Sequence, residues 1–232
     1  MIRTRSMRFV ALVVLFVVFS SVVGSGVTYG IDAAASRYFK SIQGNASLDA
    51  VMITITSMGD VITMFIFGTI ITIIRRTRKA GMIFLIALVV IVVLVMYMKP
   101  LIGRQNPPYS FDPALELPKN FSIENDSLAP FSAGFSYPSG HAGRAAAFAF
   151  IIGFAVYQKS RKAGYAMWAF PIMIGITRLY VMQHYPTDII GGILFGLIVS
   201  VVLANAMKLD QPFFMSRFNR KDDVPPQPSG NL

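Results

Sequence analysis

The sequence predicts an all-α, polytopic membrane protein. Hydrophobic residues make up 54% of the chain and charged residues only 14%, and the mean hydropathy is +0.59. A soluble core of this length would leave too little polar surface for water. A helix of about 20 apolar residues crosses about 30 Å of hydrocarbon and satisfies its own backbone groups. Apolar runs of this kind recur along the chain, so the bilayer is the expected solvent.

The apolar runs, taken in order, predict six transmembrane helices in one domain over residues 1–210. They lie near residues 9–28, 51–74, 80–98, 140–157, 164–181 and 187–207. The first follows a basic segment and is expected to be a retained span, with a cleaved signal peptide as the alternative. The second contains Gly59 and Asp60, so we expect Ser47 to Met58 to form an interfacial helix and Asp60 to cap the span itself. Residues 211–232 predict a disordered cytoplasmic tail.

Basic residues indicate the orientation of these spans. Six crossings put both termini and the second and fourth connections on one side, which carries most of the lysines and arginines, among them Arg75, Arg76 and Lys162. By the positive-inside rule this side is the cytoplasm, and the protein is expected in the cell membrane. The net charge of +10 is therefore interpreted as a topology signal, and the bilayer, not nucleic acid, is the expected partner. The opposite side holds the long connection 99–139, and connections of this length often carry function.

Both histidines of the chain lie at predicted outer ends of spans, beside other reactive residues. His141 ends the segment Tyr-Pro-Ser-Gly-His at 137–141, and His184 lies in Thr-Arg-x5-His-x3-Asp at 177–188. A third polar segment, Lys99 to Pro107, follows the third span. Hydropathy and charge alone predict this topology, and it brings all three segments to one membrane face. This coincidence predicts a functional site there.

These three segments resemble the motifs of the type 2 phosphatidic acid phosphatase superfamily. The family carries Lys-x6-Arg-Pro, Pro-Ser-Gly-His and Ser-Arg-x5-His-x3-Asp in this order, and the resemblance covers roughly residues 47–207. The matching positions are Lys99, Pro107, Pro138 to His141, Arg178, His184 and Asp188. Two positions depart from the pattern, because Thr177 replaces a serine and Asn106 replaces the arginine of the first motif. The resemblance implies an antiparallel helical bundle that hydrolyses a lipid phosphomonoester or a terminal diphosphate bond, with no metal or other cofactor.

Phosphoryl transfer needs a nucleophile, a proton donor for the leaving oxygen and positive groups around the phosphate. The motif positions imply that His184 attacks phosphorus and that Asp188 orients its ring. His141 would be the general acid and later the base that activates water. The alternative for His184 and Asp188 is a helix-capping acid beside an interfacial histidine, and both interpretations can hold together.

Further residues are candidates for holding the phosphate. Ser139 and Gly140 precede an apolar run, so they are expected at a helix N-terminus that suits an anion, with an ordinary serine cap and turn glycine as the alternative. Arg178 and Lys99 would bind phosphate oxygens, although a lysine at a span end can also simply reach the headgroups.

Asn106 is also a candidate for binding the phosphate, because its amide can donate a hydrogen bond, but it cannot supply the charge of the arginine that it replaces. We expect Arg104, two positions earlier, or Arg144, one helical turn after His141, to compensate. The alternative for Arg144 is a structural pair with an acid such as Asp60. The sequence shows no metal-ligand spacing, so no metal site is expected.

The sequence therefore favours a membrane phosphatase that acts through a phosphohistidine at the outer face. Polyprenyl diphosphate, phosphatidic acid and phosphatidylglycerol phosphate all fit as substrates, and the outward-facing site favours a polyprenyl diphosphate such as undecaprenyl diphosphate. One alternative is a lipid phosphotransferase. Another is a non-catalytic transporter or binder of anionic headgroups, although the paired broken spans typical of transporters are not visible. An inactive family member is a further alternative, because of Asn106.

Overall fold

Helices make up the regular structure of the described residues. The structure, a computed structural model, describes residues 2–118, 121–124, 126 and 129–211. Its elements are α1 (Met7–Gly24), α2 (Tyr29–Ser41), α3 (Ala46–Ser57), α4 (Val61–Ile73), α5 (Arg78–Ile102), the 3-10 turn η1 (Pro130–Ser132), α6 (Gly140–Tyr157), α7 (Arg161–Ala166), α8 (Ala169–Tyr180) and α9 (Pro186–Ala206). Within these described ranges the only β pairing is an isolated bridge between Gln105 and Phe135. The predicted all-α fold is confirmed.

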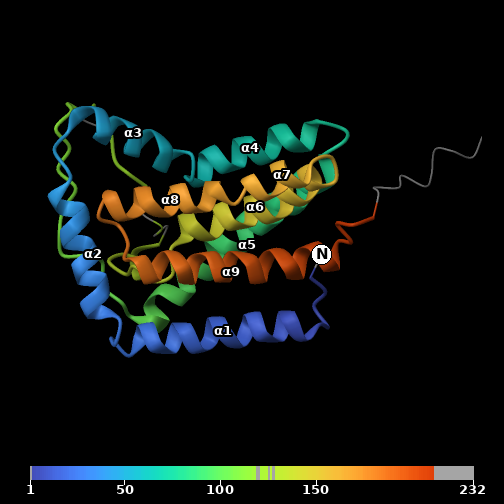
Figure 1. Cartoon of the computed structure of the whole chain (residues 1–232), viewed down its shortest axis with the longest axis horizontal. Helices are drawn as coiled ribbons and strands as arrows, with labels where there is room; N and C mark the ends of the chain where they lie inside the picture. The colour runs from blue at the N-terminus through green and yellow to red at the C-terminus, as the bar shows by residue number, and fades with distance from the viewer. Residues whose placement is uncertain (1, 119–120, 125, 127–128, 212–232) are drawn as a thin grey trace, which may run out of the picture.

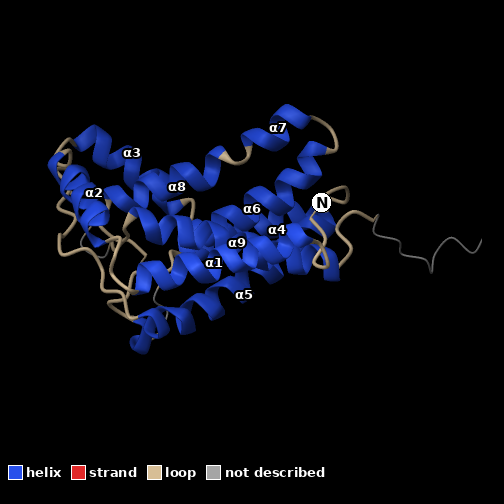
Figure 2. Cartoon of the chain, turned by 60° about the horizontal axis from the view of Figure 1, so that its bottom comes forward, coloured by secondary structure: helices blue, strands red, loops and turns tan. Residues whose placement is uncertain are grey.

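The long helices lie side by side along the longest axis of the molecule, and α2 runs across one end of the bundle (Figures 1 and 2). We refer to this end as the α2 end. The beginning of α1 and the end of α9 lie at the opposite end (Figure 1). The α5 C-terminus and the N-termini of α6 and α9 all lie toward the α2 end, so the three sequence motifs, which occupy these positions, converge there.

Four helices, α1, α5, α6 and α9, are long and apolar enough to cross a membrane. A fifth crossing is added if α3 and α4 form one span bent by 56°. This bend falls at Gly59 and Asp60, where the sequence predicted a break. The predicted span 164–181 is divided between α7 and α8, so a sixth crossing stays a prediction. Apart from Gln211, the predicted tail lies outside the described residues.

Helix α2 was not predicted from the sequence. Its buried face contains the polar residues Asp32 and Ser36, whereas Ile31 is 75% and Tyr38 is 61% exposed. Because the buried side of α2 is polar and its exposed side is apolar, the sequence has no inward-facing hydrophobic stripe from which a packed helix could be predicted. The tertiary contacts of Asp32, described below, explain why this face turns inward.

Glycines bring α6 and α9 into close contact. A Cβ atom on Gly192 would collide with the backbone oxygen of Ser139, and one on Gly196 would collide with that of Gly143. Small residues at these crossings let two helix backbones approach closely, as is common between membrane helices. The contact also holds the N-terminus of α6, which carries His141, next to the N-terminus of α9, which directly follows His184.

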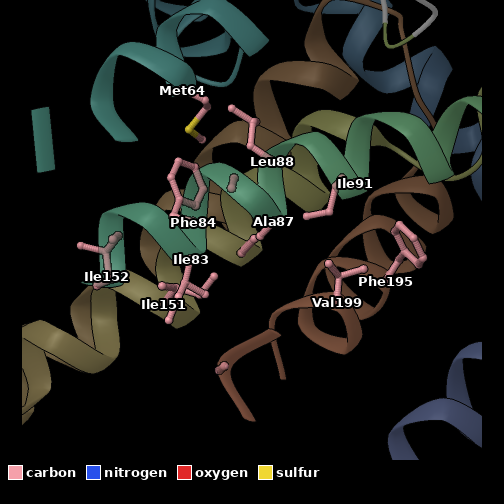
Figure 3. Close-up of a cluster of buried hydrophobic side chains, with 14 of the residues drawn as sticks. Met64, Ile83, Phe84, Ala87, Leu88, Ile91, Ile151, Ile152, Phe195 and Val199 are labelled. Carbon is pink, nitrogen blue, oxygen red and sulfur yellow. The ribbon is translucent and has the colours of Figure 1, made fainter. Parts of the chain in front are cut away.

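An apolar core fills the middle of the bundle, away from the motifs. It is formed by α4, α5, α6 and α9, and Figure 3 shows its side chains meeting between these helices. Phe84 packs edge-on against Phe148, with 5.2 Å between ring centroids. Many outward apolar residues, such as Phe65 and Val89, remain exposed in the isolated chain. Lipid would cover such a surface, whereas the polar groups gather near the α2 end.

Candidate active site

The structure brings the residues of the three motifs together. Lys99 lies near the end of α5, His141 in the first turn of α6, Arg178 in the last turn of α8 and His184 just before α9. All four side chains are buried. The sequence separation between these elements is large, so their convergence depends on the helix packing described above.

One carboxylate, that of Asp126, bridges the two imidazoles. Its Oδ1 lies 2.5 Å from His141 Nδ1, and its Oδ2 lies 2.8 Å from His184 Nε2. The backbone N–H of Gly140 donates to the same Oδ2 at 2.6 Å. The two rings are therefore separated by a single small oxyanion. A phosphate offers oxygens of the same kind to the same donors, so the gap between the rings suits a phosphate.

The α6 N-terminus forms the floor of this anion position. Ser139 is the N-cap residue, its hydroxyl accepts a hydrogen bond from the Ala142 N–H, and it also lies 3.5 Å from Asp126 Oδ2. A Cβ atom on Gly140 would lie 2.8 Å from Asp126 Cγ, so a larger residue there would push the anion away. Free N–H groups and the helix dipole favour a negative charge at this place. The capping role and the anion-binding role of Ser139 hold together.

Two of the predicted phosphate ligands, Arg144 and Arg178, flank the anion position. Arg144 NH2 lies 2.9 Å from Glu124 Oε1 and 3.3 Å from Asp126 Oδ1, and the guanidinium also donates to the Gly59 carbonyl. The pair between Arg144 and Asp60 that was considered from the sequence does not form. Arg178 NH2 donates to the Glu124 backbone oxygen at 2.8 Å, while its buried Nε has no hydrogen-bond partner among the described residues.

Arg104 contacts Asp188 instead of the bridging anion. Its guanidinium donates to Asp188 Oδ1 at 3.0 Å and to Asp32 Oδ2 at 2.6 Å, and it lies over the Tyr185 ring. Asp32 also accepts a hydrogen bond from the Thr187 hydroxyl, so α2 and the α5–α6 connection together support the start of α9. Of the two arginines expected to replace the missing charge, only Arg144 therefore lies at the anion position.

Asn106, the residue at the missing arginine, is exposed. Its backbone N–H donates to the Gly134 carbonyl beside the Gln105–Phe135 bridge. Among the residues that the structure describes, its side chain makes no hydrogen bond to the anion cluster. The described contacts place Asn106 in the outer connection, and its binding of phosphate stays a prediction.

Asp188 caps α9 more closely than it contacts His184. Its Oδ2 accepts the Tyr185 N–H at 2.7 Å, as part of a capping box, and lies 3.7 Å from His184 Nδ1. His184 Nδ1 has no hydrogen-bond partner within the described part of the chain. The expected hydrogen bond between the two side chains is thus not formed here, although the charge of Asp188 remains close enough to stabilise a positive ring.

The sequence profile of the PAP2 superfamily matches residues 79–212, more than half of the chain. The chain belongs to the PAP2 superfamily. The match begins near the start of α5 and runs through α9, so it includes every helix that carries a motif residue. The resemblance found in the sequence is thereby confirmed.

Curated relatives of this PAP2 protein include phosphatases of different lipids. It is 31% identical over 87 residues to undecaprenyl-diphosphatase BcrC of Bacillus subtilis, which covers 38% of this chain and 43% of the relative. It is 35% identical over 116 residues to lipid A 1-phosphatase of Rhizobium johnstonii, over 48% of this chain and 41% of the relative. The chain thus matches less than half the length of these two proteins. Undecaprenyl-diphosphatase of Sulfolobus acidocaldarius is 27% identical over 164 residues, 68% of this chain and 71% of that protein.

A solved structure shares the fold of this PAP2 chain. The crystal structure of a transmembrane PAP2-type phosphatidylglycerolphosphate phosphatase from Bacillus subtilis superposes with a TM-score of 0.68 and 22% sequence identity. The superposition covers 90% of this chain and all of the other one. The helical arrangement is therefore that of a PAP2 membrane protein.

Three acids of the PAP2 site were not assigned to it from the sequence. Asp60 occupies the N-cap position of α4, but its side chain makes no capping hydrogen bond and instead lies 2.9 Å from His141 Nε2. The expectation that its side chain caps the helix is wrong in this respect. Asp126 and Glu124 come from the outer connection, and their only sequence signal was their position in that segment.

The charge of Asp126 is fixed by its neighbours. Burial by itself raises the pKa of this carboxyl, but the positive field and hydrogen bonds of His141, the hydrogen bond of His184 and the charge of Arg144 outweigh it. The pKa of Asp126 is held well below its usual range. The bridging group is therefore an ionised carboxylate at neutral pH.

Three residues of the site could in principle hold a metal ion. Asp60, Glu124 and His141 each offer a ligand atom, and these atoms lie within 4.8 Å of one another. However, Arg144 NH2 lies 2.9 Å from Glu124 Oε1 and 3.0 Å from His141 Nδ1. A fixed positive charge at this position would repel a cation. The described residues fit an anion better than a metal.

Proposed function

We propose that this PAP2 protein is a lipid phosphatase that removes the terminal phosphate from a polyprenyl diphosphate through a phosphohistidine at His184. The observation that carries the proposal is the single oxyanion held between His184 Nε2 and His141 Nδ1 at the α6 N-terminus. The substrate class is supported by two relatives that are named undecaprenyl-diphosphatase. A lipid diphosphate also offers the anionic end and apolar tail that a buried polar site in a membrane bundle requires.

In the first step, the terminal phosphorus takes the position between the two rings. Once Asp126 has left, His184 carries its proton on Nδ1, beside Asp188, and the lone pair of Nε2 attacks phosphorus. A P–N bond forms and the bond to the leaving oxygen breaks. The leaving group of a diphosphate is a lipid monophosphate, and His141 gives it a proton. In the second step His141 removes a proton from water, the water oxygen bonds to phosphorus, and the P–N bond breaks to release phosphate.

Fixed positive groups stabilise the charge on the phosphoryl oxygens in this scheme. The Gly140 N–H and the Ser139 hydroxyl act from the helix N-terminus, and Arg178 and Lys99 act from α8 and α5. Arg144 supplies the charge that Asn106 lacks. The donors of Arg144 and Arg178 are already directed at acceptor oxygens of residues 124 and 126, so they need little rearrangement to bind a phosphate.

The site is proposed to face the outside of the cell membrane. Arg75, Arg76 and Lys79 lie at the connection between α4 and α5, at the end of the bundle opposite the motifs. By the positive-inside rule that end is cytoplasmic, which makes the α2 end external. A lipid substrate could then keep its tail in the bilayer while its diphosphate reaches the site.

Phosphate release by the purified protein in detergent tests this function. The substrates are undecaprenyl diphosphate, phosphatidic acid and phosphatidylglycerol phosphate. We expect the diphosphate to be turned over fastest, and His184→Ala to reduce turnover by a factor of about 10³ or more because no nucleophile remains. Orthovanadate should inhibit, since it resembles five-coordinate phosphorus, and a metal chelator should not.

Matched controls separate the other activities considered. Lys159→Gln, at the opposite end of the bundle, should leave turnover unchanged. Substantial turnover by folded His184→Ala protein, or its loss on adding a chelator, would contradict the mechanism. If an added lipid alcohol becomes phosphorylated at the expense of free phosphate, the protein is a transferase. If lipid binds but no substrate is turned over, it is a binder.

A further inference from the structure

The bridging group of the site is part of the protein itself. Asp126 accepts hydrogen bonds from both imidazoles and from the Gly140 N–H, and it lies 3.3 Å from Arg144. The proposed mechanism directs these same groups at the substrate: His184 at phosphorus, His141 at the leaving oxygen, and the Gly140 N–H and Arg144 at the phosphoryl oxygens. A carboxylate and a phosphate oxygen cannot occupy the same place, so a substrate can bind in the proposed way only after Asp126 has left.

Glu124, two residues earlier, engages donors of the two arginines of the site. Its Oε1 lies 2.9 Å from Arg144 NH2, and its backbone carbonyl accepts a hydrogen bond from Arg178 NH2 at 2.8 Å. Its Oε2 accepts the Val61 N–H at the start of α4 at 2.8 Å. This independent set of contacts shows that residues of the outer connection engage donors of both arginines of the site, and not only the imidazoles.

The chemistry of the two anions differs in a way that permits exchange. A carboxylate is planar and carries one charge, whereas a phosphate ester end is tetrahedral, carries up to two charges and presents more acceptor oxygens. The donors around Asp126 come from several directions, so a phosphate can satisfy more of them at once. A buried carboxylate without partners is strongly unfavourable, so Asp126 would move toward water when the phosphate takes its donors.

We infer that Asp126 is an internal competitor of the substrate phosphate: it fills the anion position of the free protein, and a substrate binds by displacing it. The inference rests on the proposed function for the identity of the substrate. A tethered group competes at an effective concentration of about millimolar, and the apparent affinity of a ligand falls with the fraction of molecules whose site is open. Weakly bound phosphates are therefore excluded, and the phosphate product is expelled when Asp126 returns.

Equilibrium binding of inorganic phosphate and orthovanadate to the full chain in detergent tests this inference. The variants are Asp126→Asn, which keeps the shape but removes the charge, and Asp126→Ser, which removes most of the side chain. We expect both to bind phosphate and vanadate at least tenfold more tightly than the wild-type protein. The matched control is Asp112→Asn, because Asp112 is an exposed acid of the same connection that pairs with Lys40. The control should bind as the wild type does.

Two outcomes would overturn the inference. One is an unchanged or weaker phosphate affinity in both neutral variants, which is the result expected if Asp126 only orients the imidazoles. The other comes from the wild-type protein and applies even if the variants do not fold. Saturating phosphate should increase hydrogen exchange of the backbone amides of residues 121–124 and 126, and unaltered or reduced exchange would show that Asp126 stays in place.

The binding measurement does not depend on turnover. A protein that hydrolyses no lipid but binds phosphate more tightly in the Asp126 variants refutes the proposed function and supports the competitor. If the protein hydrolyses lipid through His184 but the variants gain no affinity for phosphate, the proposed function is supported and the competitor is refuted.

Discussion

The two histidines of the site have different surroundings. Both ring nitrogens of His141 face carboxylates, Asp126 at 2.5 Å and Asp60 at 2.9 Å. His184 has one nitrogen on Asp126 at 2.8 Å, and its other nitrogen, without a hydrogen bond, lies 3.7 Å from Asp188. A ring held between two carboxylates is suited to carrying and returning a proton. A ring that directs one nitrogen at the anion position and keeps a carboxylate behind it is suited to attack phosphorus.

The supports of the two rings also come from different parts of the chain. His141 is surrounded by residues from the break between α3 and α4 and from the outer connection. His184 is followed by an α9 N-terminus that Arg104 of the α5–α6 connection and Asp32 of α2 hold in place. The His141 ring therefore lies between acidic side chains, whereas the helix that follows His184 is held at its start by ion pairs and hydrogen bonds.

The largest expected effect separates the roles of the two rings. His141→Asn should reduce turnover of both phosphatidic acid and undecaprenyl diphosphate, but the loss should be greater for phosphatidic acid. The leaving group of phosphatidic acid is an alcohol that needs the proton. The leaving group of undecaprenyl diphosphate is a lipid monophosphate, which leaves more easily without one. General acid catalysis typically contributes about 10² to 10⁴-fold, so we expect a difference of at least tenfold between the two losses. Steady-state kinetics with both lipids measures it, and equal losses would assign the proton to another group.

An intermediate effect compares the arginines of the two sides. Arg144→Gln removes a charge from the anion position and should lower kcat/KM about 100-fold, the usual scale for losing one such donor. Arg104→Gln loosens the support of Asp188 and should cost about tenfold, mainly in kcat. Arg161→Gln, at the opposite end, is the control and should change neither constant. If both neutral substitutions within the site leave turnover unaltered, neither arginine compensates for Asn106.

The smallest effect concerns stability and pH. The folded-state pKa of Asp126 lies well below its unfolded value of about 3.9, so its ionised form stabilises the fold. That contribution is present above the unfolded pKa and is lost as pH falls through the folded pKa. The difference in melting temperature between wild type and Asp126→Asn, measured in detergent, should thus stay constant from pH 7 to about pH 5 and shrink only in stronger acid. A difference that disappears near pH 6 would indicate that Asp126 is not held as an ion.

Local patterns made much of the fold predictable. The apolar runs 80–98 and 140–157 correspond closely to α5 and α6. An uninterrupted run of apolar residues sets the length of a helix in the membrane, so both helices can be predicted from consecutive residues. Gly59 and Asp60 indicated the break between α3 and α4 because an acid disfavours the bilayer interior. The divided segment 164–181 was less predictable, since the separation of α7 from α8 at Met167 and Trp168 follows no strong breaker in the sequence.

The motifs of the sequence determined which side chains are candidates for the chemistry, since Pro138 to His141 and Arg178 to Asp188 are short, contiguous patterns around the only two histidines. The tertiary structure alone decided which acids and arginines surround them. Asp126 contacts a ring 58 positions away, and Asp32 contacts Thr187 across 155 positions. Such pairs depend on which helix ends meet when α6 and α9 pack through their glycines, and no local spacing encodes that meeting.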